Sequence, residues 1–106
     1  MPREKSSSVR ATSETSLNKT TTLALPSGVA VEDGTSTRTS ATKKVFQITG
    51  ITTGTLHIDG SADGTNWTTL GNVTANGKIA NDEPWPYVRA RISAWTAGTF
   101  VAKMCE

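Results

Sequence analysis

Residues 56–70 decide the fold, and they read Leu-His-Ile-Asp-Gly-Ser-Ala-Asp-Gly-Thr-Asn-Trp-Thr-Thr-Leu. Leu56 and Ile58 alternate with polar neighbours, which is the two-residue period of a strand with one buried face. Asp63 and Gly64 then predict a turn with a positive φ at Gly64, because glycine adopts that conformation at little cost. Trp67 begins a second short strand, which completes a β-hairpin. We expect Trp67 to bury its ring beside Leu56 or Ile58.

The same alternation recurs in two segments near the C-terminus. Residues 87–94 place apolar side chains at every second position, and residues 99–104 do so again. Residues 95–98 predict a turn, residues 50–54 predict a short link between two strands, and Asn76-Gly77 predicts a hairpin turn. No window of helical length shows the spacing of an amphipathic helix. The chain is therefore expected to be all-β.

Further short strands are predicted over residues 19–25, 29–32 and 43–49. A total of about seven or eight short strands is typical of a small antiparallel β-sandwich or a jelly-roll-like barrel. The apolar positions of these strands predict the core. They are Phe46, Ile48, Leu56, Ile58, Leu70, Val73, Val88, Ile92, Phe100 and Met104.

The composition indicates one domain with a tail. A length of 106 residues allows a single domain. Hydrophobic residues make up 35% and aromatic residues 6%, which is low for a globular domain, so part of the chain is expected to lie outside the core. Residues 1–18 are rich in Ser and in charge. We expect an extended N-terminal arm over residues 1–18, which orders on assembly, and a β-sandwich domain over residues 19–106.

Charge and cysteine content exclude several classes of protein. The net charge of +2 is too small for a nucleic-acid-binding surface, so no nucleic-acid partner is expected. The basic pairs Lys43-Lys44 and Arg89/Arg91 are expected on solvated surfaces. The single cysteine, Cys105, cannot form an internal disulfide. Neither a secretory signal nor a membrane span is recognisable, so we expect folding in a reducing cytoplasm and no membrane association.

The sequence offers few groups for catalysis. His57 is the only histidine and occupies a polar strand position, where we expect a surface or interface role. A catalytic triad would need a nucleophile and an acid around it. No Cys/His cluster has the spacing of a zinc site, and no Gly-rich loop precedes a helix that could hold phosphate. We therefore expect no enzyme, no catalytic residue, no cofactor and no cofactor-binding residue.

Residues 59–64 match the start of a calcium-binding loop, with oxygen ligands at alternate positions and Gly64 in sixth place. The bidentate Glu of such a loop belongs in twelfth place, where this chain has Leu70. No flanking helices are predicted either. We therefore expect a β-turn here and no metal ligand.

Three tryptophans, Trp67, Trp85 and Trp95, allow two interpretations. Their flat rings could form a platform for a sugar. Alternatively, they cap the core or an interface between subunits, since Trp is both strongly buried on average and enriched at interfaces. The core or interface role is the expected one. Trp85, which lies between Pro84 and Pro86, is predicted to be the most exposed of the three and is the candidate for sugar binding.

Three stretches carry a family pattern: Gly60-Ser61-x-Asp63-Gly64-x-x-Trp67, Glu83-Pro84-Trp85-Pro86-Tyr87-Val88-Arg89-Ala90 and Thr96-Ala97-Gly98-Thr99. Through them, residues 43–104 resemble small β-sandwich virion structural proteins of tailed bacteriophages. These are capsid decoration or cement proteins and other head-associated proteins. The arm over residues 1–18 takes no part in the resemblance.

The resemblance implies a non-enzymatic structural protein of the virion, made in the cytoplasm of the host bacterium. Most specifically, it implies a capsid decoration or cement protein that stabilises the junctions between capsomers. The alternatives are a head–tail connector, a tail or fibre component, or a carbohydrate-binding module for host attachment. The implied partners are the major capsid protein or other virion subunits and further copies of the chain in a dimer or trimer. A host glycan is the partner under the last alternative.

Overall fold

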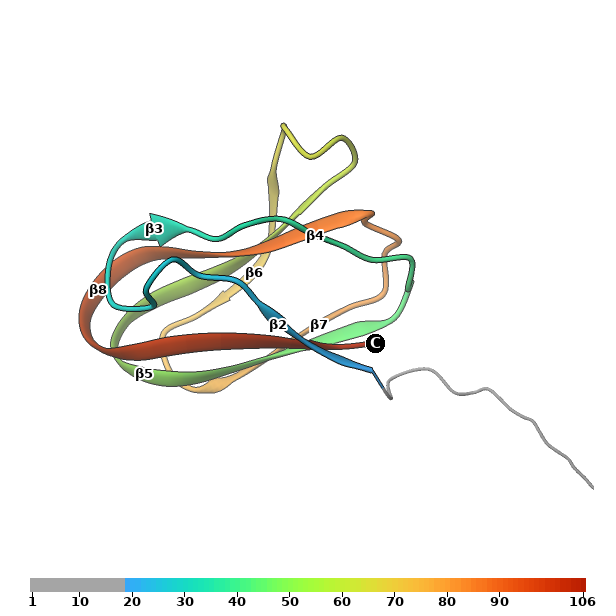
Figure 1. Ribbon diagram of the computed structural model, residues 1–106. Coiled ribbons are helices and arrows are strands. Elements are labelled where there is room, and N and C mark those ends of the chain that lie inside the picture. The colour runs from blue at the N-terminus through green and yellow to red at the C-terminus, as the bar shows by residue number, and fades with distance from the viewer. Residues whose placement is uncertain (1–18) are drawn as a thin grey trace, which may run out of the picture.

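The computed structural model describes residues 19–106 as an all-β domain without helices, so none of these residues forms a helix that could cross a membrane (Figure 1). Within this range, antiparallel strands form a single open sheet of seven strands. They are β2 (Thr20–Leu23), β3 (Glu32–Asp33), β4 (Thr37–Arg38), β5 (Lys44–Ser61), β6 (Thr68–Val73), β7 (Gly77–Asn81) and β8 (Tyr87–Cys105). The predicted fold class is confirmed. The arm predicted over residues 1–18 lies outside the described residues.

Two long strands, β5 and β8, run through both layers of the molecule. They pair from Val45 with Cys105 at one end to Ser61 with Tyr87 at the other. Their register shifts repeatedly between residues 49 and 56 of β5, where both strands bend and the sheet folds over onto itself (Figure 1). The result is a sandwich whose two layers share both central strands.

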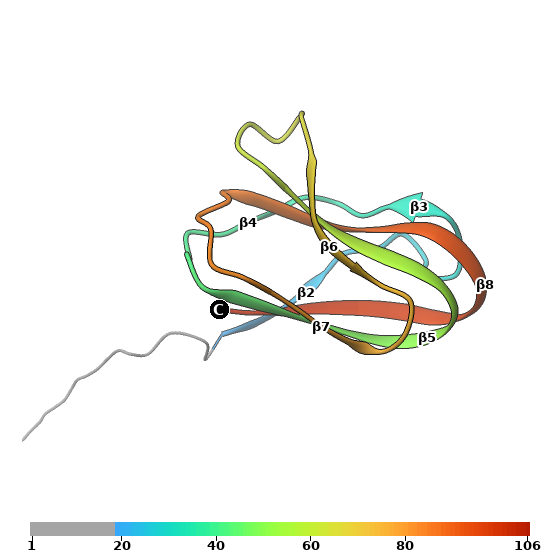
Figure 2. The same cartoon turned by 180° about the vertical axis from the view of Figure 1, so that it is seen from behind.

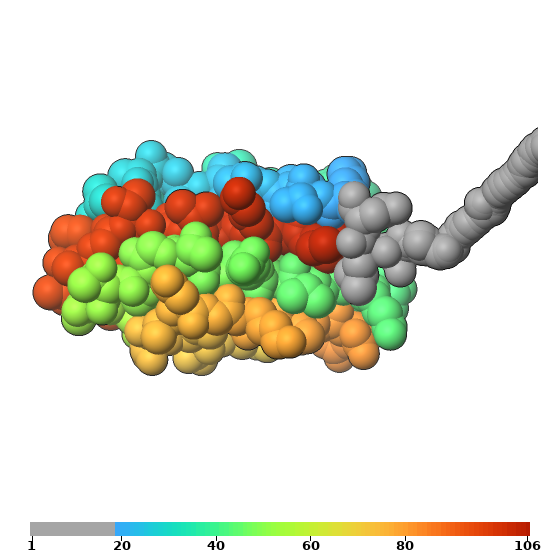
Figure 3. Space-filling view, turned by 90° about the horizontal axis from the view of Figure 1, so that it is seen from below, coloured from blue at the N-terminus to red at the C-terminus, as the bar shows by residue number. Residues whose placement is uncertain are grey.

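Short strands complete each layer beside the β5–β8 pair. β3 and β4 pair with the first half of β8, and β6 pairs with the second half of β5. In the other layer, β2 pairs with the end of β8 and β7 pairs with the start of β5. Seen from below, this second layer is a row of four bands in the order β2, β8, β5, β7 (Figure 3).

Two of the predicted connections are bends inside continuous strands. Residues 50–54 lie within β5, and residues 95–98 lie within β8. Gly50 and Gly98 have φ values of 81° and 110°, which favour glycine, and their backbones pack directly against each other's strand. A bend at a positive φ favours glycine just as a turn does, so the two cannot be told apart from the sequence. The link predicted over residues 50–54 and the turn predicted over residues 95–98 are therefore wrong.

The turn predicted at Asn76-Gly77 exists, but it does not form a hairpin. It joins β6 to β7, and these two strands pair with different halves of β5. The turn therefore carries the chain from one layer to the other, as the view from behind shows (Figure 2). Asn76 Oδ1 accepts a hydrogen bond of 2.9 Å from the backbone N–H of Ile51, which fixes the turn to the bend in β5.

The strand predicted over residues 29–32 is also wrong, because only Glu32 of this stretch lies in a strand. The Glu32 carboxylate accepts hydrogen bonds from the backbone N–H groups of Ser27 (2.9 Å) and Gly28 (2.7 Å). These bonds hold the pKa of Glu32 below its ordinary value. The same hydrogen bonds hold residues 27–31 in a loop, so this stretch does not form a strand. Val29 and Val31 of the loop are exposed.

The core lies between the two layers, as the alternation predicts. Every predicted core residue is buried except Leu70 and Val73, which are partly buried and pack against the others. Leu23 and Ile79 are also buried, and the alternation does not predict them, because β2 and β7 are too short to show a clear period.

Lys44 is buried and only 1% exposed, although the sequence predicts a solvated basic pair. Its Nζ donates to the backbone oxygens of Ala41 (2.8 Å), Thr42 (3.2 Å) and Glu83 (2.6 Å). Burial lowers the pKa of Lys44 from its ordinary value, and nearby carboxylates offset part of that shift. The ammonium group thus joins the loop before β5 to the loop before β8.

Replacing Lys44 with Met is expected to lower the free energy of unfolding by about 3 kcal/mol, because buried carbonyl groups lose a charged hydrogen-bond donor. The neighbouring residue supplies the control. Lys43 is exposed, so Lys43→Met is expected to change stability by less than about 0.5 kcal/mol. Urea unfolding followed by circular dichroism measures both. Equal effects of the two substitutions would contradict a structural role of the buried ammonium group.

Candidate functional site

Three loops gather at the end of the sandwich opposite the bends. We call this end, formed by residues 38–43, 62–67 and 82–87, the loop end. The backbone N–H of Thr39 donates to the carbonyl oxygen of Pro86 (3.0 Å), which joins two of the loops. The third loop, between β5 and β6, projects away from the sandwich (Figure 1).

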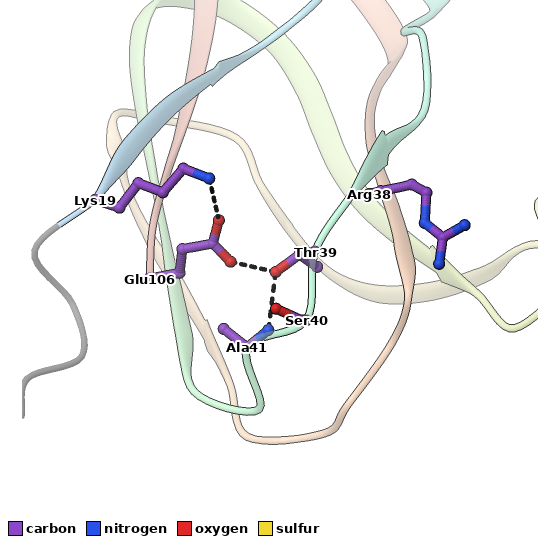
Figure 4. Close-up of a pocket in the computed structure, with 6 residues that line it drawn as sticks. All are labelled: Lys19, Arg38, Thr39, Ser40, Ala41 and Glu106. Carbon is purple, nitrogen blue, oxygen red and sulfur yellow. Dashed lines mark hydrogen bonds and ion pairs between the residues drawn. The ribbon is translucent and has the colours of Figure 1, made fainter. Parts of the chain in front are cut away.

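A hollow of about 450 Å³ lies at the loop end. Its lining residues are Lys19, Arg38, Thr39, Ser40, Ala41 and Glu106 (Figure 4). Lys19 Nζ lies 3.8 Å from one carboxylate oxygen of Glu106, and the other oxygen accepts a hydrogen bond from the Thr39 hydroxyl. Arg38 points away toward Tyr87 (Figure 4). Lys19, Glu106 and Thr39 therefore bond to one another across the hollow.

The projecting loop is held by its own side chains. Ser61 Oγ accepts hydrogen bonds from the backbone N–H groups of Asp63 (3.2 Å) and Gly64 (2.9 Å). Asp63 Oδ1 accepts from those of Asn66 (2.9 Å) and Thr65 (2.8 Å), and these bonds hold the pKa of Asp63 far below its ordinary value. Gly64 has φ = 80°, which confirms the prediction from the sequence.

The two carboxylates of the calcium-like stretch point to different partners. Asp63 binds the N–H groups of its own loop, and Asp59 binds two arginines. Residues 19–106 bring no three His, Cys, Asp or Glu side chains together in a group that could hold a metal ion. Residues 59–61 form the end of β5, and the chain bends over residues 62–66.

Trp67 does not pack beside Leu56 or Ile58, so that prediction is wrong. It is half-buried and does not belong to the core that contains Leu56 and Ile58. The Arg89 guanidinium lies over its ring, 4.4 Å from the ring centre, in a cation–π contact. Trp67 therefore covers an arginine on the outer face of the first layer.

Replacing Trp67 with Ala is expected to lower the free energy of unfolding by about 1–2 kcal/mol, the range of a partly desolvated cation–π contact. A loss of 3 kcal/mol or more would be the mark of a fully buried aromatic ring, about 3–5 kcal/mol. Thermal and urea unfolding distinguish the two ranges. Trp67→Tyr is the matched control, because it keeps an aromatic face over Arg89 and should recover most of the loss.

A buried carboxylate organises the outer face of this layer. Asp59 is 2% exposed and accepts hydrogen bonds from Arg91 Nε (2.8 Å), Arg89 Nε (3.1 Å) and Thr69 Oγ1 (3.2 Å). The two arginine side chains are only 18% and 26% exposed. The expectation that Arg89 and Arg91 lie on a solvated surface is therefore wrong. Both arginines lie on β8, which pairs with the β5 strand of Asp59, so matching outward positions across these two strands would have revealed the cluster.

His57 lies beside this cluster, on the outward side as predicted. Its Nε2 is 2.7 Å from Ser93 Oγ, and its Nδ1 is buried without a hydrogen-bond partner among the described residues. Burial and the positive charge of Arg91 lower the pKa of His57. Among residues 19–106, no carboxylate accepts a hydrogen bond from His57 Nδ1, as the carboxylate of a triad does. His57 therefore packs among polar side chains on the outer face, beside Ser93 and Arg91.

Trp85 and Trp95 both pack against the core and are half-buried. Trp95 Nε1 donates to the carbonyl oxygen of Gly98 (2.9 Å), which closes the bend in β8. Trp85 adjoins an open hollow of about 320 Å³ at the loop end. Both residues therefore cap the core, as predicted. Trp85 also lines the open hollow, so part of its surface is accessible to a ligand.

The fold and the loop end define an antiparallel β-sandwich with two shared central strands and a rigid loop surface at one end. No family model and no curated protein matches the sequence. Among solved structures, the chain is similar to the crystal structure of the PBSX exported protein XepA. The similarity has a TM-score of 0.58 and 22% sequence identity and covers 90% of this chain. This chain spans 39% of the length of XepA.

Proposed function

We propose that this chain is a non-enzymatic structural protein of a bacteriophage virion, and specifically a capsid decoration or cement protein. The observation that carries the phage assignment is the similarity of 90% of the chain to XepA, an exported protein of the phage PBSX. The sequence pattern of residues 60–67 and 83–90, which resembles small phage virion proteins, supports the same class.

In this role, the chain would bind the major capsid protein at the junctions between capsomers. The loop end supports such a role, because internal hydrogen bonds and the buried Lys44 fix its loops before any partner binds. A rigid surface loses little conformational entropy on binding. Free sheet edges could add backbone hydrogen bonds to a neighbouring subunit, and assembly of the chain as a dimer or trimer would multiply these contacts.

A binding and stoichiometry experiment tests the proposal. Purified chain is added to phage heads that lack it, and the copy number per particle is measured by quantitative mass spectrometry. The cement role predicts a copy number that matches the capsomer junctions and heads that resist heating better with the chain than without it. A copy number that matches a single ring at the neck or tail would support a connector or tail component. No binding to any particle would contradict a virion role.

A further inference from the structure

We propose that the hollow beside Trp85 binds a pyranose ring of a neutral saccharide. This site goes beyond the structural role and does not depend on where the chain lies in a virion. The hollow of about 320 Å³ is lined by Ala62, Glu83, Pro84, Trp85 and Pro86. We call it the Trp85 hollow. Its size lies at the lower end of the usual range for ligand pockets, about 300–1,000 Å³, and suits a single ring.

The indole of Trp85 is fixed before any ligand arrives. A Cβ built on Gly60 would lie 2.8 Å from both Cγ and Cδ2 of Trp85, so one face of the ring rests on the bare backbone of Gly60. The indole Nε1 donates to Glu83 Oε1 (3.0 Å), and the backbone N–H of Trp85 donates to the Glu83 carbonyl oxygen (2.9 Å). Prolines on both sides restrict the backbone further. Such preorganisation removes much of the entropic cost of binding.

The chemistry of the hollow matches one face of a sugar ring. The only polar atom of the indole is already bonded to Glu83, so the ring offers an apolar π surface. That bond also holds the Glu83 carboxylate at the edge of the indole. Its Oε2 accepts no hydrogen bond from residues 19–106. A pyranose stacked on Trp85 would place its C–H groups on the indole and its outward hydroxyl groups beside this acceptor.

The surrounding charges and aromatic residues favour a neutral sugar over other ligands. Glu83 is the one charged residue that lines the hollow, and its carboxylate disfavours an anionic ligand. A proline-rich peptide docks in a groove lined by several aromatic side chains. Here the neighbouring aromatic rings are already covered, because Trp67 lies under Arg89 and Tyr87 lies under Arg38. The hollow therefore offers a single aromatic platform with an adjacent acceptor.

Nuclear magnetic resonance of the isolated chain tests this site. The signal of the Trp85 indole N–H is followed during titration with methyl β-glucopyranoside, methyl β-galactopyranoside or chitotriose. We expect a saturable shift with at least one of these cyclic probes and none with mannitol, an open-chain polyol with similar hydroxyl groups. Ala62→Trp fills the hollow from an exposed position and should weaken binding by about tenfold or more. Thr65→Trp adds the same bulk to the same loop outside the hollow and should leave binding unchanged.

Two results would overturn the saccharide site. One is the lack of a saturable shift with every cyclic probe, and the other is an equal shift in the Ala62→Trp variant. If a polyproline peptide shifts the Trp85 signal and the sugars do not, the hollow is a peptide site. None of these results concerns the binding of the chain to phage heads, so the virion role stands or fails separately.

Discussion

Replacing Gly50 with Ala is expected to lower the free energy of unfolding by at least about 4 kcal/mol, which is exceptional for one methyl group. Gly50 lies where β5 bends, with φ = 81°. A Cβ at this position would collide with the carbonyl oxygen of Thr99 in β8. Backbone atoms cannot move aside as a flexible side chain does, so the two long strands would have to separate. Backbone strain at a positive φ adds about 1–3 kcal/mol.

Gly77→Ala provides the matched control for Gly50→Ala. Gly77 begins β7, and the atoms nearest to a Cβ there would be 3.8 Å away or farther. We expect this substitution to change stability by less than about 1 kcal/mol. Thermal unfolding and far-ultraviolet circular dichroism compare the two variants. A Gly50→Ala protein as stable as the Gly77→Ala protein would mean that the bend is not a fixed crossing of the two strands.

Replacing Asp59 with Asn is expected to cost about 3–5 kcal/mol, the usual effect of removing one partner from a buried ion pair. The substitution keeps the shape of the side chain but removes the buried counter-charge that Arg91 and Arg89 share, and Arg89 keeps only the exposed Asp33 at 3.9 Å. Asp33→Asn is the control. Asp33 is 63% exposed and 3.9 Å from Arg89, so its loss should cost about 0–1 kcal/mol. Similar losses for the two variants would contradict the dominant role of the buried carboxylate.

The pH dependence of stability gives a second test of Asp59. Burial alone would raise its pKa, but the hydrogen bonds and charges of Arg91 and Arg89 outweigh burial and hold the pKa below its ordinary value. The stabilisation by Asp59 is therefore complete above the unfolded-state pKa of about 3.9. It is lost as the pH falls through the lower pKa of the folded state. Asp59→Asn should remove this part of the acid sensitivity, so its stability should fall less steeply below that pH.

The sequence predicts the all-β class and most of the core, because side-chain alternation is a local property of a strand. The period at residues 87–94 identifies Val88 and Ile92 as buried, and both are. The bends are different. Gly98 lets β8 bend where it crosses β5. The local composition around a bend in a strand is the same as that around a turn that reverses the chain, so the sequence cannot distinguish them.

The partners of the buried charged residues cannot be predicted from the sequence for a related reason. Lys44 is buried by carbonyl groups from two loops, one of them 39 residues away along the chain. The alternation along β8 places Arg89 on the outward face, where an exposed side chain is expected. Asp59 of β5 and Trp67 of the loop after β5 nevertheless cover it. Such partners become visible only after the strands are placed beside one another. The two prolines that flank Trp85 are a local signal, and they do predict an open surface at this residue, where the hollow lies.

The two shared central strands also govern how the domain comes apart. In a sandwich with separate sheets, one sheet can loosen while the other persists. Here β5 and β8 supply the middle of both layers, so opening either layer would pull on the strands that hold the other. The amide hydrogens of both layers should therefore exchange with solvent through a single cooperative opening. The same pairing joins residues that are distant along the chain, which is typical of slow folding.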